Sequence, residues 1–475
     1  MSTTVEYKGN VLTTVNNETR TLLTSGKYLE GNISVTDVTK VAVKTDPVKF
    51  IDYDGTILHS YSVSDFMALS AMPSNPTHSG LTSQGWNWSL ADAKTQLTKY
   101  PEAGLTIGQM YITDDGKTRL YVHFEEGRLH PYLGICPNGT VVVDWGDNSA
   151  TSTITGDSLT TVKYADHEYA SAGDYVITLT VSSGSFVFYS PFDTSTILNK
   201  DISVTLYIHR VYTNCLQKVE LGSNVSIGSY AFGDCSSLTS ITIPDGVTSI
   251  GSYAFYYCYS LASITIPDGV TSIGSNAFTR CTSLTSITIP DGVPSIGTNT
   301  FSNCSSLTSI TIPDSVTSIS NNAFSNCYSL ASITIPDSVA SIGNNAFMGC
   351  YALASITIPD GVPSIGSNMF SNCSSLTSIT IPDSVTSISS SAFSNCYALA
   401  SITIPDNVAS IGNNAFNNCY GMGEYHILPT TVPTLGTTAF NNIQSDCVIY
   451  VPSASLSAYQ TANNWSTYAS YMQGE

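Results

Sequence analysis

Positive charge is almost absent from the second half of this chain. Arg280 is the only one of the 16 Lys and Arg residues that lies beyond residue 220, and the net charge of the whole chain is −19. Because a surface so poor in cations cannot neutralise phosphate groups, we do not expect nucleic acid or anionic lipid as a partner.

Long apolar runs and an export signal are also missing. No segment holds the roughly 18 consecutive apolar residues that a membrane span requires. The first residues, 1–8, have neither the basic start nor the apolar stretch of a Sec signal peptide. We therefore expect a protein that is made in a cytoplasm, is not exported by that route and does not insert into a membrane.

The cysteine spacing of metal sites is absent as well, since none of the 12 cysteines forms a C-x-x-C pair. Nine cysteines instead recur every 23 residues, and nine phenylalanines keep the same step. These cysteines are Cys235, Cys258, Cys281, Cys304, Cys327, Cys350, Cys373, Cys396 and Cys419. A fixed short period predicts one unit stacked on copies of itself, with the thiols as a reduced, buried ladder. Vertical disulfides and metal ligation are the alternatives.

The residue pattern of each repeat predicts a strand, a turn and a second edge of the coil that also faces the core. In the first full copy, Ile241 and Ile243 point inward while Thr242 points outward. The spacing within residues 254–258 predicts a short turn of helix behind the strands. The patterns Ile-x-Ile-Pro and Ala-Phe-x-x-Cys resemble the BspA-like leucine-rich repeat, which implies a β-solenoid of about ten coils over residues 211–422.

A second resemblance lies just before the repeats. Trp145-Gly146-Asp147, followed by His167–Tyr169 and Ala172–Tyr175, resembles the PKD domain, a small immunoglobulin-like β-sandwich. The resemblance implies a spacer or binding module with no chemistry of its own. We expect residues 211–225 to close the neighbouring end of the solenoid, because an open end would expose its core.

The expected fold class is multidomain, with small β-rich and α+β modules, a sandwich and a leucine-rich-repeat solenoid. The expected domains are a β-rich docking segment at 1–44, an α+β module at 45–135, the PKD-like sandwich at 136–190, a connector at 191–210, the repeats at 211–422, and a last coil with a C-terminal cap at 423–475. The expected local elements are strands at 5–7, 11–15, 33–35 and 48–51, helices opening on Ser64 and Ser89, a hairpin of 109–112 with 119–124 around the turn 114–117, and a helix within 457–471.

Two groups of residues suggest chemistry. Asp52-Tyr53-Asp54-Gly55-Thr56 resembles the nucleophile loop of haloacid-dehalogenase-like phosphatases, which implies Asp52 as nucleophile and Asp54 as acid. That reaction also needs a lysine and further Mg²⁺ ligands on a parallel sheet, so we favour an acidic turn. His123 and Glu125 would share one face of a strand, but nearby arginines favour ordinary ion pairs over a metal site.

Three polar or aromatic rows follow the repeat. An aspartate after each proline, from Asp245 to Asp406, favours a turn role, with weak Ca²⁺ attraction as the alternative. A threonine row, from Thr242 to Thr403, suits a solvated strand face and could also hydrogen-bond carbohydrate or ordered water. The candidate ligand-binding residues are Tyr256, Tyr257, Tyr259, Arg280, Tyr328, Tyr351, Tyr397, Thr242, Thr265 and Thr288.

These features together predict a non-enzymatic adhesin or receptor-binding protein without a cofactor. Its expected partner is a glycan or protein on a host cell surface. Residues 7–27 loosely resemble N-terminal modules of phage and prophage structural proteins of gut bacteria. That resemblance implies a tail-associated virion protein that contacts other virion subunits, and a bacterial cell-surface adhesin is the alternative setting. The alternative from another class is a phosphatase at Asp52 and Asp54.

Overall fold

The computed structural model describes four strands between residues 3 and 30, and then residues 48–99, 105–188, 213–223 and 225–475. The chain divides into two compact units, Met1–Asp46 and Pro47–Glu475. The first unit is an antiparallel sheet whose strands follow sequence order. Its strands are β1 (Thr3–Tyr7), β2 (Asn10–Val15), β3 (Glu18–Leu22) and β4 (Tyr28–Glu30). The strands predicted at 5–7 and 11–15 are confirmed, and the one predicted at 33–35 lies outside the described residues.

The second unit begins with a four-stranded sheet and two helices, which we call the docked module (residues 48–99 and 105–113). The sheet has the order β6-β5-β8-β7. The elements are β5 (Val48–Ile51), β6 (Ile57–Tyr61), α1 (Val63–Met67), β7 (Leu81–Trp86), α2 (Leu90–Lys99) and β8 (Thr106–Thr113). Ser62 caps α1 by accepting from the Asp65 N–H, so this helix opens two residues earlier than predicted. Phe50, Phe66 and Ile107 belong to the core of the docked module, which is separate from the core of the solenoid.

The hairpin predicted around residues 114–117 is wrong. Strand β8 pairs with β5 and β7, whereas β9 (Thr118–Phe124) pairs with β13 (Gly173–Phe188) and β14 (Leu216–Glu220). Alternate residues of β9 are buried in the second core of the molecule, which fixes its backbone between β13 and the first coil. Residues 114–117 therefore turn the chain from one sheet to the next.

The residues that resembled a PKD domain do meet, but a separate immunoglobulin-like spacer is not confirmed. The His167 ring stacks on Trp145 at 5.0 Å between centroids, and the Tyr169 hydroxyl donates to the Trp145 carbonyl oxygen at 2.8 Å. These residues lie among β10 (Tyr132–Asp144), β11 (Ser152–Asp157), β12 (Lys163–Asp166) and β13. The buried cluster that includes Trp145 continues into the solenoid, from Leu120 to Met472.

Two strands of this region also close the solenoid. Strand β9 pairs with β14 of the first coil, and β13 pairs with β15 (Val225–Ile227) on its second edge. The Phe188 ring packs on Phe232 at 5.2 Å between centroids. The prediction that residues 211–225 form the cap is thereby corrected, because the strands described there, β14 and the start of β15, belong to the first coil and are covered by β9 and β13.

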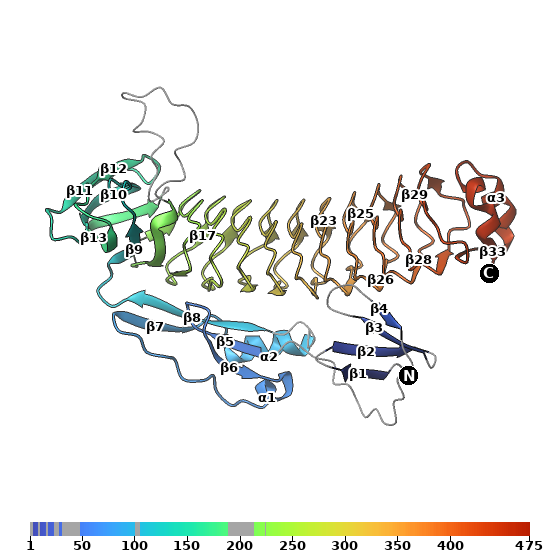
Figure 1. Cartoon of the computed structure of the whole chain (residues 1–475), viewed down its shortest axis with the longest axis horizontal. Helices are drawn as coiled ribbons and strands as arrows, with labels where there is room; N and C mark the ends of the chain where they lie inside the picture. Colours follow the sequence, from blue (N-terminus) through green and yellow to red (C-terminus); the bar gives the residue numbers. More distant parts are fainter. Residues whose placement is uncertain are drawn as a thin grey trace, which may run out of the picture. The chain divides into compact units, whose positions relative to one another are not determined.

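The solenoid carries two rows of short parallel strands in register (Figure 1). The front row contains β14, β16 (Ser240–Thr242), β19 (Ser286–Thr288), β21 (Ser309–Thr311), β24 (Ser355–Thr357), β26 (Ser378–Thr380), β28 (Ser401–Ile404), β30 (Glu424–Ile427), β32 (Val448–Val451) and β33 (Met472–Gly474). The second row contains β15, β17 (Ser249–Ile250), β18 (Ser272–Ile273), β20 (Ser295–Ile296), β22 (Ser318–Ile319), β23 (Ser341–Ile342), β25 (Ser364–Ile365), β27 (Ser387–Ile388), β29 (Ser410–Ile411) and β31 (Thr434–Leu435). The predicted β-solenoid is confirmed.

Phenylalanine and cysteine columns fill the interior of the solenoid. Rings in adjacent coils stack in parallel, as Phe324 and Phe347 do with centroids 5.5 Å apart. Each thiol of the column from Cys258 onward donates to a phenylalanine carbonyl oxygen, as Cys327 does to Phe301 at 3.2 Å. Every described cysteine is buried and unbridged, so the predicted reduced ladder is confirmed. Burial raises the pKa of the Cys304 thiol to about 12, which makes it a packing group and a poor nucleophile.

The predicted turn of helix on the back edge is wrong. Alternate N–H groups bond to the next coil, as Phe255 does to the Ala277 carbonyl oxygen at 2.8 Å. The others bond three residues back, as Cys258 does to the Phe255 carbonyl oxygen at 3.2 Å, so the four-residue bonds of an α-helix do not form. Two residues in each turn adopt left-handed backbone angles, for example Tyr253 at φ 60° and Tyr257 at φ 61°. The back edge is thus a stack of turns held together between coils.

The C-terminal end of the solenoid is capped by helical segments, as predicted for 457–471. The cap comprises η3 (Ser453–Ser455), α3 (Leu456–Thr461) and η4 (Trp465–Tyr471), followed by β33. The fully buried Trp465 packs against Tyr459 and donates to the Pro433 carbonyl oxygen at 2.8 Å. In the part of the chain described here, no helix combines the length and apolar character of a membrane span.

Candidate functional site

The threonine row is buried in its first half and open in its second. Four threonines are almost inaccessible, with exposures of 2% for Thr242, 7% for Thr265, and 6% for Thr288 and Thr311. Further along, the strands β24, β26 and β28 expose the same repeat positions. The open positions are Thr357, Thr380 and Thr403. The expectation that Thr242, Thr265 and Thr288 face a ligand from outside the chain is therefore corrected.

The docked module accounts for the buried half. Its strand β8 contacts β16 and β19, and the Thr288 hydroxyl donates to the Thr106 carbonyl oxygen at 2.7 Å. Gly108 lies so close to Thr265 that a Cβ at this position would overlap the threonine side chain. Thr265 and Thr288 thus face a segment of the protein itself, and Thr288 binds it.

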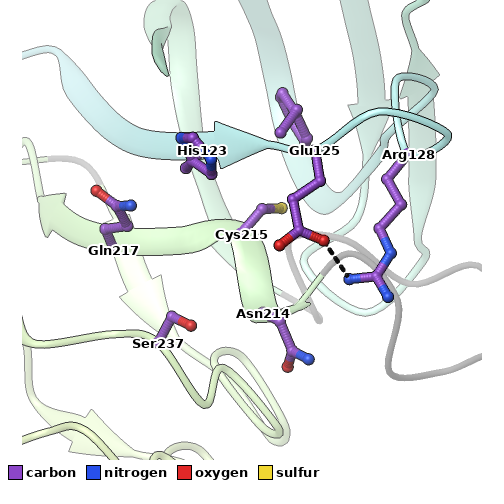
Figure 2. A pocket seen from close by; sticks show the side chains of 8 residues that line it. His123, Glu125, Arg128, Asn214, Cys215, Gln217 and Ser237 are labelled. Carbon is purple, nitrogen blue, oxygen red and sulfur yellow. Dashed lines mark ion pairs between the residues drawn. The ribbon is translucent and has the colours of Figure 1, made fainter. Parts of the chain in front are cut away.

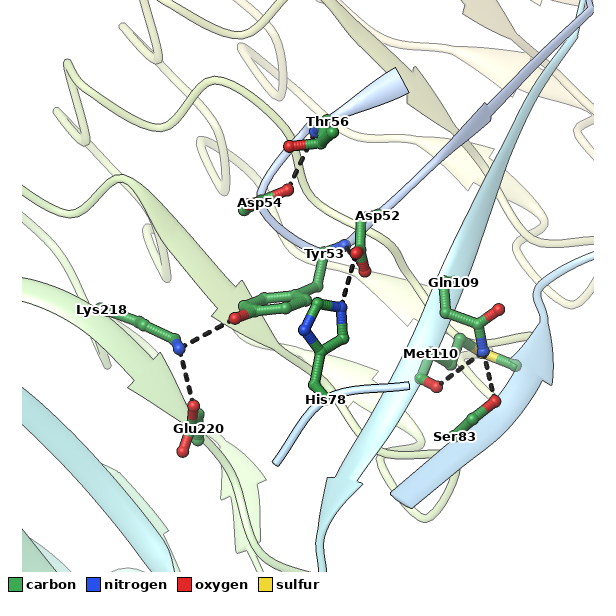
Figure 3. Close-up of polar contacts among 10 residues, drawn as sticks. All are labelled: Asp52, Tyr53, Asp54, Thr56, His78, Ser83, Gln109, Met110, Lys218 and Glu220. Carbon is green, nitrogen blue, oxygen red and sulfur yellow. Dashed lines mark hydrogen bonds and ion pairs between the residues drawn. The ribbon is translucent and has the colours of Figure 1, made fainter. Parts of the chain in front are cut away.

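The Asp52 loop takes part in this docking (Figure 3). Asp52 is 4% exposed and its Oδ2 lies 2.6 Å from His78 Nε2. The Tyr53 hydroxyl accepts from Lys218 Nζ at 2.9 Å, and that ammonium group also pairs with Glu220 at 2.7 Å. The Asp54 carboxylate accepts from the Thr56 N–H at 2.9 Å, which is the acidic turn we favoured. The loop therefore has a structural role in which Asp52 is paired and enclosed.

A groove of about 230 Å³ lies on the open half of the front row. Its lining consists of Ser378, Ile379, Thr380, Ile381, Asp383, Ser401, Ile402, Thr403, Pro405 and Leu428. Beyond it, His426 stacks on Tyr450 at 4.9 Å between centroids. Burial opposes the charged form of His426, but hydrogen bonds to Glu475 and Glu424 raise its pKa above the usual value. The open face thus combines hydroxyl rows with an aromatic pair at its end.

The aspartate row is crowded where the docked module meets it. A cavity of about 30 Å³ brings Asp92 of α2 near Asp268 and Asp291. Burial raises the pKa of Asp268 to about 6, and the neighbouring carboxylates, Asp291 foremost, add to this shift.

We expect docking to strengthen as the pH falls. Because the folded-state pKa of Asp268 lies near 6 and its usual value is 3.8, the folded state binds more protons between these values. Charged Asp268 therefore destabilises the docked state above pH 6, and this cost disappears as the pH falls toward 4. Limited proteolysis of residues 48–113 at pH 7 and pH 5 measures the effect.

The control for this prediction is Asp268→Asn, which removes the charge at every pH. The variant should resist proteolysis better than the wild type at pH 7, and this advantage should shrink as the pH falls toward 4. Equal protection of the two proteins at pH 7 would contradict the assignment.

Three tyrosines and Arg280, the one arginine of the repeats, form a cluster on the back turns. The Tyr257 ring lies 3.9 Å from Tyr256 and 5.5 Å from Tyr259 between centroids, and the Arg280 guanidinium carbon lies 4.9 Å from the Tyr257 centroid. The structure thus brings together four of the predicted ligand-binding residues. We call them the tyrosine–arginine cluster.

Two members of this cluster occupy a strained backbone position. Tyr257 and Arg280 occupy a position where the chain adopts φ of 61° and 62°, and where six later coils carry asparagine. A left-handed conformation costs roughly 1–2 kcal/mol per residue for most L-amino acids, and asparagine tolerates it best after glycine. Tyr257 and Arg280 are therefore costly choices at these sites.

The remaining predicted tyrosines form exposed pairs. Tyr328 stacks on Tyr351 at 5.0 Å, and Tyr397 stacks on Tyr420 at 5.7 Å between centroids. Sequence reasoning missed Tyr420, although it follows Cys419 just as Tyr397 follows Cys396. It also missed Tyr230, which is 47% exposed. Tyr230 lies two residues before Phe232, a repeat position that most later coils fill with asparagine.

His123 and Glu125 each have an ordinary polar partner, and Arg128 supplies an ion pair. His123 Nδ1 lies 2.7 Å from Asp174 Oδ1, and Arg128 Nη1 lies 3.2 Å from Glu125 Oε2. His123, Glu125 and Arg128 line a cavity of about 310 Å³ at the first coil (Figure 2). Among the described residues, no group of three His, Cys, Asp or Glu side chains is arranged to hold a metal ion.

Comparisons with known proteins identify the repeat family. The pattern of the BspA type leucine rich repeat region matches residues 209–331 and 317–447, with six copies. A leucine-rich-repeat protein of T. pallidum is 32% identical over 34% of this chain and 78% of its own, with a TM-score of 0.33. A leucine rich cell surface protein of Faecalibacterium prausnitzii is 28% identical over 52% and 91%, with a TM-score of 0.27. A leucine-rich repeat protein of Bacteroides ovatus is 24% identical over 62% and 97%, with a TM-score of 0.34. No curated protein matches the chain.

Proposed function

Because the chain belongs to the family of BspA-type leucine-rich-repeat proteins, we propose that it is a non-enzymatic binding protein that holds a partner on the open half of its front row. The observation that carries the proposal is the change from buried to open threonines along one row. In the buried half, Thr288 already holds a carbonyl group of the docked module. The open half offers the same hydroxyl groups to another molecule.

The partner we propose is a glycan or protein on a host cell surface. The open face has rows of serine and threonine hydroxyls, with an isoleucine between them pointing into the core. Successive coils repeat this set at roughly 4.8 Å, so the face suits an extended chain with many small polar contacts. The groove over β26 and β28 gives such a chain a place to lie.

Replacing Thr380 by tryptophan should fill this groove and weaken binding by about tenfold or more. The measurement is binding of the full chain to a glycan array and to intact cells. Thr386→Trp is the matched control, because Thr386 is exposed on the same coil but precedes β27 of the second row. Equal loss in both variants, or in neither, would remove the front row from the proposal.

The narrower setting we propose is a tail-associated virion protein that is anchored by the first unit. The resemblance of residues 7–27 to phage modules supports it. The competing setting is a bacterial cell-surface adhesin. Antibody labelling of purified virions and of intact bacteria separates them, because label on virions supports the first and label on cells supports the second.

A further inference from the structure

The tyrosine–arginine cluster interrupts an ordered feature of the back turns. In later coils, asparagines at this position bond to one another, as Asn395 Nδ2 does to Asn372 Oδ1 at 2.9 Å and Asn418 Nδ2 does to Asn395 Oδ1 at 2.8 Å. Tyr257 and Arg280 give up this amide ladder and also adopt the left-handed backbone. Two adjacent coils thus lack both the hydrogen-bonded amides and the residue type that tolerates this backbone. This indicates that the Tyr257 and Arg280 side chains serve another purpose.

The cluster belongs to a larger aromatic surface. The Tyr253 ring lies 5.4 Å from Tyr256 and stacks on Tyr230 at 4.5 Å, with only 2° between the ring planes. Tyr230 is 47% exposed and Tyr259 is 38% exposed, so two rings offer accessible faces. These rings lie on the back turns and not on the front row, so the surface is separate from the proposed groove.

Charge singles out the same place. Residues 221–475 contain one cation, Arg280, and 12 Asp and Glu residues. Arg280 is exposed, and its side-chain hydrogen bond to Tyr259 raises its pKa further, so it is always charged. A guanidinium group can pair with a carboxylate through two parallel hydrogen bonds. Lys218 of the first coil is already paired with Glu220, so Arg280 is the permanent positive charge that the repeats offer to an anionic group.

We propose that the tyrosine–arginine cluster binds a carboxylate-bearing sugar of an acidic glycan. The exposed tyrosine faces pack on the C–H face of the sugar ring, and Arg280 pairs with its carboxylate. Asp234, whose charge reaches Tyr256, disfavours compact anions such as phosphate and can accept hydrogen bonds from sugar hydroxyls. The site therefore selects for a ligand that combines an apolar ring face, hydroxyls and a single negative charge.

The test uses the full chain and an array of sialylated and uronic-acid glycans, each beside its methyl ester. The ester keeps the sugar and removes the charge. We expect binding to the acids, and at least a tenfold loss on the esters. We also expect at least a tenfold loss with Arg280→Asn, which installs the residue of the later coils. Because this change relieves backbone strain, the melting temperature should stay level or rise, so the loss cannot be attributed to unfolding.

A matched pair of tyrosine variants completes the test. Tyr259→Ala should weaken binding, whereas Tyr397→Ala, at the same position of a coil without arginine, should not. Thr380→Trp should leave this binding intact, which separates it from binding on the front row. The proposal is overturned if the wild type ignores every acidic glycan, if Arg280→Asn binds as the wild type does, or if an aspartate-rich peptide is the better ligand.

Discussion

A chain that begins at residue 213 should fail to fold cooperatively, whereas one that begins at residue 114 should fold. The first coil is completed by strands from the preceding region, because β9 pairs with β14 and β13 pairs with β15. Without them Leu216, Val219 and Phe232, which are fully buried in the whole protein, would face water. We expect the loss of most of the roughly 5–15 kcal/mol that stabilises a typical domain.

Size-exclusion chromatography and urea unfolding followed by circular dichroism measure this difference. The chain from residue 114 is the control, because it keeps β9 to β13 and lacks only the first unit and the docked module. Its newly exposed surface is rich in serine and threonine, such as Ser240, Thr242 and Thr265. A monomeric 213–475 fragment with the unfolding midpoint of the longer chain would show that β9 and β13 are not a cap.

Replacing Phe347 by alanine should lower the free energy of unfolding by about 3–5 kcal/mol. The Phe347 ring is fully buried between Phe324 and Phe370, with centroids 5.5 and 5.6 Å away. The flanking rings are fixed by their own coils and cannot close on the cavity, so little of the lost contact is recovered. Denaturant unfolding of the full chain gives the change in free energy.

The comparison variant is Tyr351→Ala, four residues further along the same coil. Tyr351 is 47% exposed and its ring stacks on Tyr328 alone among the described aromatic side chains. Its removal should cost about 1 kcal/mol or less. Similar losses for the two variants would mean that the phenylalanine column is not the core of the solenoid.

The sequence predicts the solenoid well because every core position repeats. Ile241, Phe255 and Cys258 each belong to a column whose members meet identical neighbours one coil away. The cap was mispredicted for the opposite reason. Strand β9 finds its partners in β13 and β14, far along the chain, and local turn residues at 114–117 favoured a hairpin that does not form.

The candidate sites divide in the same way. The tyrosine–arginine cluster could be found from sequence, because Tyr257 and Arg280 depart from a repeated asparagine in adjacent coils. Which threonines are open could not be found. That depends on a contact between Tyr53 and Lys218, 165 residues apart, and on the close approach of Gly108 to Thr265. Each of these contacts occurs once in the chain, so the 23-residue repeat of the sequence carries no information about it.

The uneven covering of the threonine row has an evolutionary consequence. The docked module occupies a fixed number of coils, and the buried threonines end at Thr311. Duplication of one 23-residue block beyond that point would add a whole coil to the uncovered stretch and leave both caps unchanged. Unequal recombination between near-identical blocks would thus lengthen or shorten the open half of the front row in steps of roughly 4.8 Å. Each added coil would meet the same neighbours as the coils already present.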